Sequence, residues 1–208
     1  MDTSDLTALT DRARTLAAAG GRRILGIAGA PGAGKSTLAA RLVEQLAGRA
    51  VLVPMDGFHL AGAELERLGR AGRKGAPDTF DAAGYAALLR RLRHPEGQDP
   101  VYAPAFDRAI EEPVAGSVRV PADVPLVVTE GNYLLLDEGP WALVRGLLDE
   151  VWFLDAVPAT RVRGLVDRHV RFGKSRPDAE RWVAGSDERN ARLVERHRDR
   201  ADLVVRLR

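Results

Sequence analysis

The clearest chemical signal in the sequence is one run of glycine, lysine and hydroxyl residues. The run fits the pattern GxxxxGKS and consists of Gly29, Ala30, Pro31, Gly32, Ala33, Gly34, Lys35, Ser36 and Thr37. Glycines let successive backbone N–H groups point at one anion, and a following helix adds the positive end of its dipole. Lys35 can reach the β- and γ-phosphates of a nucleotide, and the Ser36 hydroxyl can ligate Mg²⁺. The run therefore predicts a phosphate-binding loop rather than a simple glycine-rich turn.

Two acidic side chains follow apolar runs that are the right length for buried strands. Asp56 comes shortly after residues 51–53, and Glu130 ends the run of residues 126–129. Because ligands bind at the carboxyl ends of parallel strands, both acids are expected at the edge that carries the loop. We predict that Asp56 is a general base for an acceptor hydroxyl and that Glu130 is a second Mg²⁺ ligand. The alternatives are helix capping by Asp56 and a salt bridge or cap made by Glu130.

A basic helix near the C-terminus has the features of a lid. Arg168 lies on this helix, and Lys174 follows a glycine that can act as a hinge before the next helix. Positive charge on such a hinged pair can close over a phosphoryl group and stabilise its transition state, so both residues are candidate catalytic groups. We interpret the other arginines, Arg161, Arg163 and Arg171, as a solvated face.

Candidates for contact with the acceptor lie between the two acids. His59 is one of them, although a lone histidine near a helix start is as often structural. Tyr102, Phe106, Asp107 and Arg108 occur in extended pieces interrupted by proline, which suggest a small flap at the sheet edge. These four residues either line an acceptor pocket or only pack the flap.

Residues 60–80 are rich in glycine, arginine and lysine, and we interpret them as a mobile surface segment. The residues that discriminate between acceptors are expected in the region of residues 60–110. A basic lining made by Arg73, Lys74 and Arg108 would favour an anionic acceptor, such as a sugar phosphate or a carboxylate.

Apolar periodicity predicts the elements that position these groups. Short buried strands are expected at residues 22–28, 51–53, 126–129, 151–154 and 203–205. Helices are expected at residues 4–19 with Ser4 as N-cap, after the loop, after Asp81, from Pro158 and at residues 187–200. Strands that alternate with helices in this way predict an α/β fold with a parallel sheet.

Composition narrows the class of protein. The 208 residues suit a single domain, residues 1–208, with an acceptor-side insertion at about 60–120 and a lid at about 160–185. Lys and Arg number 31 against 29 Asp and Glu, and the net charge of +2 gives no strong field for nucleic acid. The chain has no cysteine, no signal-type apolar segment and no 18-residue apolar run. We expect a cytoplasmic protein without a nucleic-acid partner or membrane insertion; the oligomeric state, a homodimer included, stays open.

The ordered set of motifs resembles the P-loop kinases of the uridine kinase, phosphoribulokinase and bacterial pantothenate kinase superfamily. It is most similar to small bacterial proteins labelled fructose transport system kinases or nucleoside/nucleotide kinase family proteins. The likeness runs from about residue 22 to the end, through the loop and the stretches 55–59, 77–81, 102–107, 130–136, 168–169 and 173–174. In uridine kinases the positions of His169 and Lys174 are usually acidic and arginine, respectively.

The resemblance implies a three-layer P-loop NTPase sandwich with a five-stranded parallel sheet of order 2-3-1-4-5, a small flap and a helical lid. It also implies ATP as the phosphoryl donor and Mg²⁺ as cofactor. By position, Asp56 matches the catalytic base of the family, and Lys35, Ser36 and Glu130 match its phosphate and metal residues. Arg168 matches the lid arginine, and we add Tyr133 to the expected acceptor contacts.

We therefore expect an ATP- and Mg²⁺-dependent phosphotransferase that acts on a hydroxyl of a sugar, nucleoside or pantothenate-like small molecule. One alternative is a regulatory P-loop NTPase that hydrolyses nucleotide without an acceptor. The chain has no NKxD-type tetrad, and its third predicted strand ends in Thr129-Glu130 rather than Asp-Glu. The other alternative, a non-catalytic nucleotide-binding module, is disfavoured because Lys35, Asp56 and Glu130 are all present.

Overall fold

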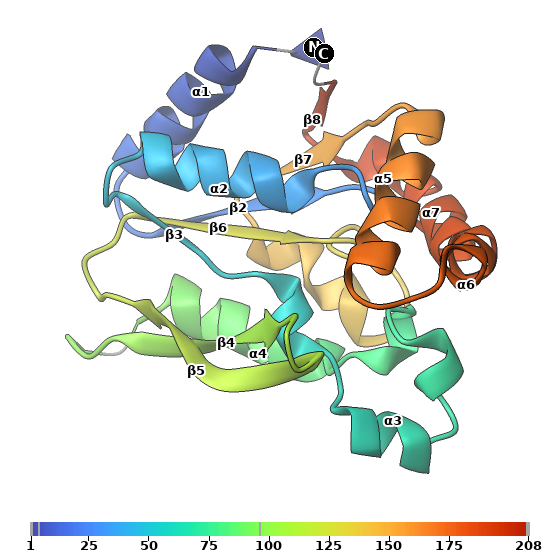
Figure 1. Cartoon of the computed structure of the whole chain (residues 1–208). Coiled ribbons are helices and arrows are strands. Elements are labelled where there is room, and N and C mark those ends of the chain that lie inside the picture. The colour runs from blue at the N-terminus through green and yellow to red at the C-terminus, as the bar shows by residue number, and fades with distance from the viewer. Residues whose placement is uncertain (1, 4, 96, 207–208) are drawn as a thin grey trace.

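The chain folds around a six-stranded parallel sheet, shown edge-on in Figure 1. The computed structural model describes residues 2–3, 5–95 and 97–206. The strands of this sheet are β1 (Asp2–Thr3), β2 (Arg23–Ala28), β3 (Ala50–Leu52), β6 (Leu126–Gly131), β7 (Glu150–Leu154) and β8 (Leu203–Val205). They lie in the order β1-β8-β7-β2-β6-β3. The five predicted strands thus keep their predicted order, and β1 adds an edge strand that is too short to show in an apolar pattern.

Helices cover both faces of the sheet and make the three predicted layers (Figure 1). On one face α1 (Leu6–Ala18) and α2 (Lys35–Gln45) pack against side chains of the central strands, such as Leu25 and Trp152. On the other face α4 (Ala82–Arg93) and two 3₁₀ turns, Gly139–Leu143 and Arg145–Leu147, cover Ile24 and Val127. Within the described part of the chain, no helix is long and apolar enough to cross a membrane.

The helices α1 and α4 each begin with an aspartate N-cap. Asp5 caps α1 by accepting a hydrogen bond from the Thr7 amide, whereas the predicted cap, Ser4, lies outside the described residues. Asp81 caps α4 by accepting a hydrogen bond from the Gly84 amide.

The register of the central strands brings the predicted chemistry to one edge. β2 lies between β6 and β7, and its last residue, Ala28, is paired with Gly131 of β6 and Phe153 of β7. The loop that follows β2 therefore begins beside Glu130, and β3, on the far side of β6, delivers Asp56 to the same edge. Parallel pairing alone accounts for this convergence.

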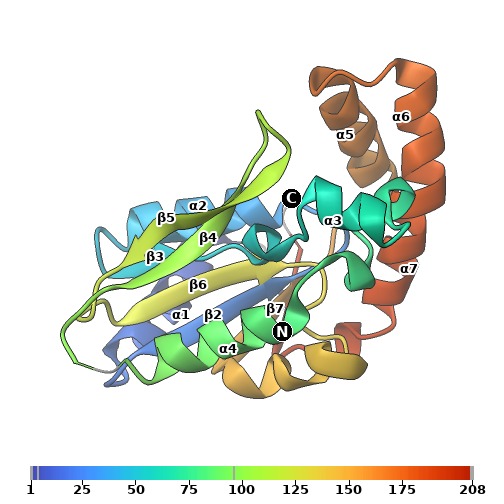
Figure 2. The same ribbon diagram turned by 90° about the horizontal axis from the view of Figure 1, so that it is seen from below.

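Two additions to the sheet surround this edge. The first is an antiparallel hairpin made by β4 (Val101–Asp107) and β5 (Glu112–Val120). The second is the helical segment α5 (Pro158–Arg171), α6 (Arg176–Trp182), a π-helical turn (Val183–Asp187) and α7 (Glu188–Glu195). Figure 2 shows the hairpin and α5–α6 rising beyond the sheet on the same side. Residues 60–80 form α3 (Gly62–Arg67) and two 3₁₀ turns, Ala71–Arg73 and Pro77–Thr79.

Candidate active site

The loop between β2 and α2 presents the N-terminus of α2 to the edge of the sheet. Gly34 is the N-cap, with a φ of +92°, and no described side chain caps the helix. The amides of the first turn are therefore available to an anion. Gly32 has a φ of +78°, and a Cβ there would lie 2.6 Å from Leu165 Cγ on α5. Glycine is thus needed at position 32 both for the backbone angle and for the close approach of α5.

Lys35, the first residue of α2, is buried at the base of this edge. Its Nζ donates to the carbonyl oxygen of Ala30 at 3.0 Å and to Oδ1 of Asn132 at 2.8 Å. Burial lowers the pKa of Lys35, and the negative charges of Glu130 and Asp56 oppose this change. Asn132 is a contact that the sequence analysis missed, and the one signal for it was its place directly after Glu130-Gly131.

Ser36 and Glu130 form a hydroxyl–carboxylate pair beside Lys35. Ser36 Oγ donates to Glu130 Oε1 at 2.8 Å, and the Glu130 side chain is buried, with 6% of its surface exposed. Burial, followed by the charge of Asp56, raises the pKa of Glu130 above its ordinary value. Among the described residues, no group of three or more His, Cys, Asp and Glu side chains could hold a metal ion. A cation here would therefore need ligands beyond the protein carboxylates.

Asp56 lies in the 3₁₀ turn Met55–Phe58 that follows β3. Its Oδ2 accepts a hydrogen bond from Arg108 Nη2 of the hairpin at 2.7 Å, and both side chains are partly exposed. The side chain of Asp56 caps no helix, since the structure gives no capping bond at this turn. The hairpin sits close to the turn because Gly57 leaves room for it: a Cβ at Gly57 would lie 2.3 Å from the Pro104 carbonyl oxygen.

His59 lies between this turn and two aromatic side chains of the site, Phe80 and Phe106. Its Nδ1 lies 2.9 Å from the Asp56 carbonyl oxygen, and because a carbonyl can only accept, Nδ1 carries the hydrogen. The ring stacks near Phe80 and Phe106, with centroids 3.9 Å and 4.8 Å away. Burial is the main cause that lowers the pKa of His59. His59 thus packs against aromatic side chains and also lines the cavity, and its contact with an acceptor stays a prediction.

The lid contributes cations to the same space. Arg168 of α5 lines the cavity, and the structure gives it no hydrogen bond or ion pair with any described residue. Arg168 is exposed, but desolvation by the surrounding residues lowers its pKa, and repulsion from Arg108 adds to this change. Lys174 Nζ lies 4.8 Å from the centre of the Trp182 ring. Two cations of the lid, one of them unpaired, therefore face the loop and the hairpin.

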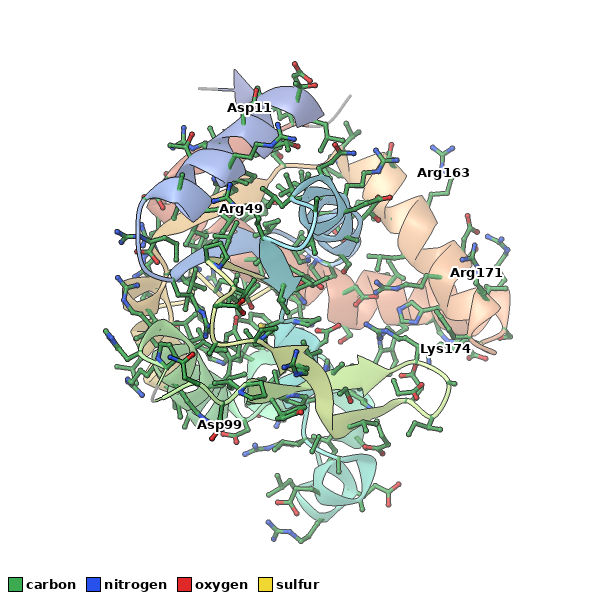
Figure 3. The ribbon with its side chains drawn as sticks, turned by 90° about the vertical axis from the view of Figure 1, so that its left-hand side faces the viewer. Asp11, Arg49, Asp99, Arg163, Arg171 and Lys174 are labelled. Atoms are coloured by element: carbon green, nitrogen blue, oxygen red, sulfur yellow. The ribbon has the colours of Figure 1, made fainter. Side chains whose placement is uncertain are left out.

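One arginine of α5 contradicts the predicted solvated face. Arg161 is buried, donates to the Pro31 carbonyl oxygen at 3.1 Å and pairs with Glu188 of α7. The prediction was wrong because Arg161 lies on the side of α5 that faces the phosphate loop. Arg163 and Arg171 are exposed as predicted, and Figure 3 shows both on the outer side of the helix.

Two tyrosines expected at the acceptor do not line the cavity. Tyr102 has 52% of its surface exposed, because the alternation of β4 buries Val101 and Ala103 and turns the residue between them outwards. Tyr133 is fully buried, and its hydroxyl donates to the carbonyl oxygen of Gly75. Tyr133 therefore packs beneath the site and holds the segment that carries Lys74.

The loop, both acids, the hairpin and the lid surround one cavity of about 460 Å³. This volume lies within the usual range for small-molecule sites. The expected residues that line it are Pro31, Gly32, Lys35, Ser36, Asp56, His59, Lys74, Phe106, Arg108, Glu130, Arg168 and Lys174. The lining also includes residues without a predicted site role, among them Asn132, Phe172, Trp182, Asp187 and Asn190.

A phosphate loop, a buried lysine and a lid around one cavity define a P-loop nucleotide-binding protein of the kinase type. No model of a protein family matches the chain. A protein of Schizosaccharomyces pombe named "putative uridine kinase" is 33% identical, over 98% of this chain and 91% of the relative. An Aspergillus versicolor protein named "ATP-dependent kinase-like protein notR'" is 35% identical, over 69% of this chain and 88% of its own.

Solved structures give the same classification. A protein of Silicibacter sp. TM1040 described as a "putative fructose transport system kinase" superposes with a TM-score of 0.87 and 36% identity. The match covers 97% of this chain and 99% of that one. The chain belongs to the uridine kinase-like family of P-loop kinases, which use ATP.

Proposed function

We propose that the protein transfers the γ-phosphoryl group of ATP to a hydroxyl of a small molecule. The observation that carries this proposal is that the phosphate loop and Asp56 line one cavity, although they follow different strands. A nucleotide phosphate at the N-terminus of α2 would point towards Asp56. A carboxylate at that place can take the proton of an acceptor hydroxyl. Sugars, nucleosides and pantothenate-like alcohols all offer such a hydroxyl.

The remaining polar residues suit the charge that develops during transfer. Lys35 and the amides of the loop would bind the β- and γ-phosphates, and the buried surroundings strengthen each of these interactions. Arg168 is available for the transferring group because it has no described partner. Lys174, on the second half of the lid, would add a further positive charge when the lid closes.

The donor set beside Lys35 fits Mg²⁺. A hydroxyl and a carboxylate are oxygen ligands of the kind that Mg²⁺ prefers, with phosphate and water completing its shell. The positive charge of the ion would offset the unfavourable burial of the Glu130 carboxylate, whose pKa is raised. When bound, the ion would neutralise phosphate charge. Ser36 and Glu130 are the residues that would hold it.

The test is ADP release from Mg-ATP with and without each member of an acceptor panel of sugars, nucleosides, pantothenate and sugar phosphates. We expect one acceptor to raise the rate strongly, and Asp56→Asn to lower that rate about 10²-fold or more while ATP still binds. Asp107→Asn is a matched control, because among the described residues its side chain accepts only from the Ala109 amide and does not line the cavity.

Other outcomes would contradict the proposal. Near-full activity of Asp56→Asn would show that Asp56 is not the general base. Nucleotide hydrolysis that no acceptor changes would favour a regulatory NTPase, and nucleotide binding without turnover would favour a binding module. A cytoplasmic location, the absence of nucleic-acid and membrane partners, and a homodimeric state remain predictions.

A further inference from the structure

The side of the cavity beyond Asp56 carries two cationic side chains, Lys74 and Arg108. Two cations lie on one aromatic ring there: Lys74 Nζ is 5.0 Å and Arg108 Cζ 4.8 Å from the centre of Phe106. All three residues line the cavity. Arg108 pairs with Asp56, whereas the hydrogen bond of Lys74 goes to the backbone carbonyl of Glu111. Among the described contacts, Lys74 thus has an aromatic ring and a carbonyl but no carboxylate.

Three other acids line the cavity, Glu111, Glu130 and Asp187, and the last two have partners of their own. Glu130 accepts from Ser36, and Asp187 pairs with His169 of the lid at 2.9 Å. Glu111 is exposed at the tip of the hairpin, with a φ of +55°. Of the two cations on the acceptor side, only the guanidinium of Arg108 is paired with a carboxylate among the described contacts, and that carboxylate is the proposed base.

Arg108 connects this charge to catalysis. In the structure its guanidinium occupies Oδ2 of Asp56, one of the two carboxylate oxygens of the proposed base. A neutral acceptor has to compete with a charge-assisted hydrogen bond, whereas an acceptor with its own anionic group gives Arg108 a new partner. The repulsion between Arg108 and Arg168 also favours an anion between the two arginines.

The contacts around Lys74 show that its position is built into the fold. The carbonyl of Gly75, the next residue, accepts from the buried Tyr133 hydroxyl and from Asn190 Nδ2 of α7, the latter at 3.2 Å. Gly75 has a φ of +96°, a backbone angle that favours glycine. Two buried side chains from separate elements thus hold the backbone beside Lys74, which is unlike a lysine on a free surface loop.

We propose, on the basis of the kinase function above, that the phosphoryl acceptor is a small hydroxy compound carrying a carboxylate or phosphate. Lys74 and Arg108, which both lie over the Phe106 ring, bind this anionic group. The hydroxyl and the anionic group are close in such a compound, because Arg108 reaches both Asp56 and the ring that Lys74 contacts. Carboxylate and phosphate share the chemistry that this pair of cations recognises.

The test compares acceptors that differ in the anionic group: glycerol with glycerate, panthenol with pantothenate, and fructose with fructose 6-phosphate. We expect an anionic member to have kcat/KM at least tenfold above its neutral counterpart, and the pairs to distinguish carboxylate from phosphate. Lys74→Met should lower kcat/KM for that acceptor about 10- to 100-fold, mainly through KM, with the KM for ATP unchanged. Arg73→Met is the matched control, since Arg73 pairs with Asp78 and does not line this cavity.

The outcomes separate this inference from the kinase function. Phosphorylation of a neutral acceptor with no gain from an anionic group would overturn the inference and leave the kinase function standing. A preference for the anionic acceptor that survives in Lys74→Met would also overturn it. If no acceptor in any pair accelerates ADP release while ATP binds, the kinase proposal fails, and this inference fails with it.

Discussion

Replacing Glu130 by glutamine should stabilise the unligated protein and at the same time impair it as a kinase. Glutamine is nearly the same size and keeps a side-chain oxygen for the Ser36 hydroxyl, which lies 2.8 Å from Glu130 Oε1. What the change removes is a buried negative charge. Most substitutions lower stability, whereas removal of a strained functional group can raise it, so a gain in stability with a loss of activity would support the proposed role.

The balance of interactions at Glu130 gives the direction of the stability change. Burial and the charge of Asp56 disfavour the carboxylate, while Lys35 and the Ser36 hydroxyl favour it. The pKa of Glu130 is nonetheless raised, so the unfavourable pair dominates, and a neutral side chain is preferred in the folded state. One pKa unit corresponds to about 1.4 kcal/mol. A gain of about 1 kcal/mol in the free energy of unfolding would raise Tm by about 2–4 °C in a protein of this size.

The loss of activity follows from the proposed metal ligand. Lewis-acid and charge-neutralising effects of a bound metal amount to several kcal/mol in a transition state, and about 3 kcal/mol corresponds to roughly 10²-fold in rate. We expect kcat with Mg-ATP to fall by at least this factor in Glu130→Gln. Mg-ATP should also raise the Tm of the wild-type protein more than that of the variant.

Differential scanning fluorimetry with and without Mg-ATP, followed by the ADP-release assay, would measure both effects. Glu150→Gln is the matched control, because Glu150 is also buried but pairs with Arg12 and accepts from Trp152 Nε1. That variant should lose stability and keep activity. A Glu130→Gln protein with lower Tm and full activity would refute the reasoning, since the charge would then be structural.

Three further predictions concern the wall of the cavity and the lid. Because burial places the folded-state pKa of His59 below the ordinary value of 6.5, stability should fall as pH drops below 6.5, and urea unfolding of His59→Gln should lack this component. Gly57→Ala should cost about 1–3 kcal/mol of stability in urea unfolding and reduce turnover, because its Cβ would meet the Pro104 carbonyl at 2.3 Å. Binding of Mg-ATP should change tryptophan fluorescence, and Trp182→Phe should abolish that change, because the other two tryptophans are buried away from the cavity.

The phosphate end of the site could be predicted because local patterns determine it. The loop follows a buried strand, and Glu130 ends another, so the rule for parallel strands was enough to bring Lys35, Ser36 and Glu130 together. Asp56 follows β3, a further strand of the same sheet, so the same rule places it at this edge. The order of the five predicted strands is confirmed, whereas β1 was missed because Asp2–Thr3 carries no apolar run.

The direction of Arg161 could not be predicted in the same way. Helical periodicity placed it among other arginines, and a run of arginines on one helix is usually solvated. Its partners are the Pro31 carbonyl, 130 residues away, and Glu188 on another helix. Those two contacts determine which face of α5 is buried. Neither contact can be predicted from the local sequence.

The acceptor end depends even more on contacts between distant segments. Lys74 reaches Phe106 because two 3₁₀ turns, with no regular period to read, carry it there. The Gly75 carbonyl then joins this segment to Asn190 of α7, 115 residues along the chain. Movement of α7 would therefore be transmitted to the backbone beside Lys74, so closure of the lid and binding of the acceptor are expected to be coupled. The phosphate loop of this fold is thus encoded locally, whereas the proposed acceptor side depends on how the segment of residues 71–75, the hairpin and the lid meet.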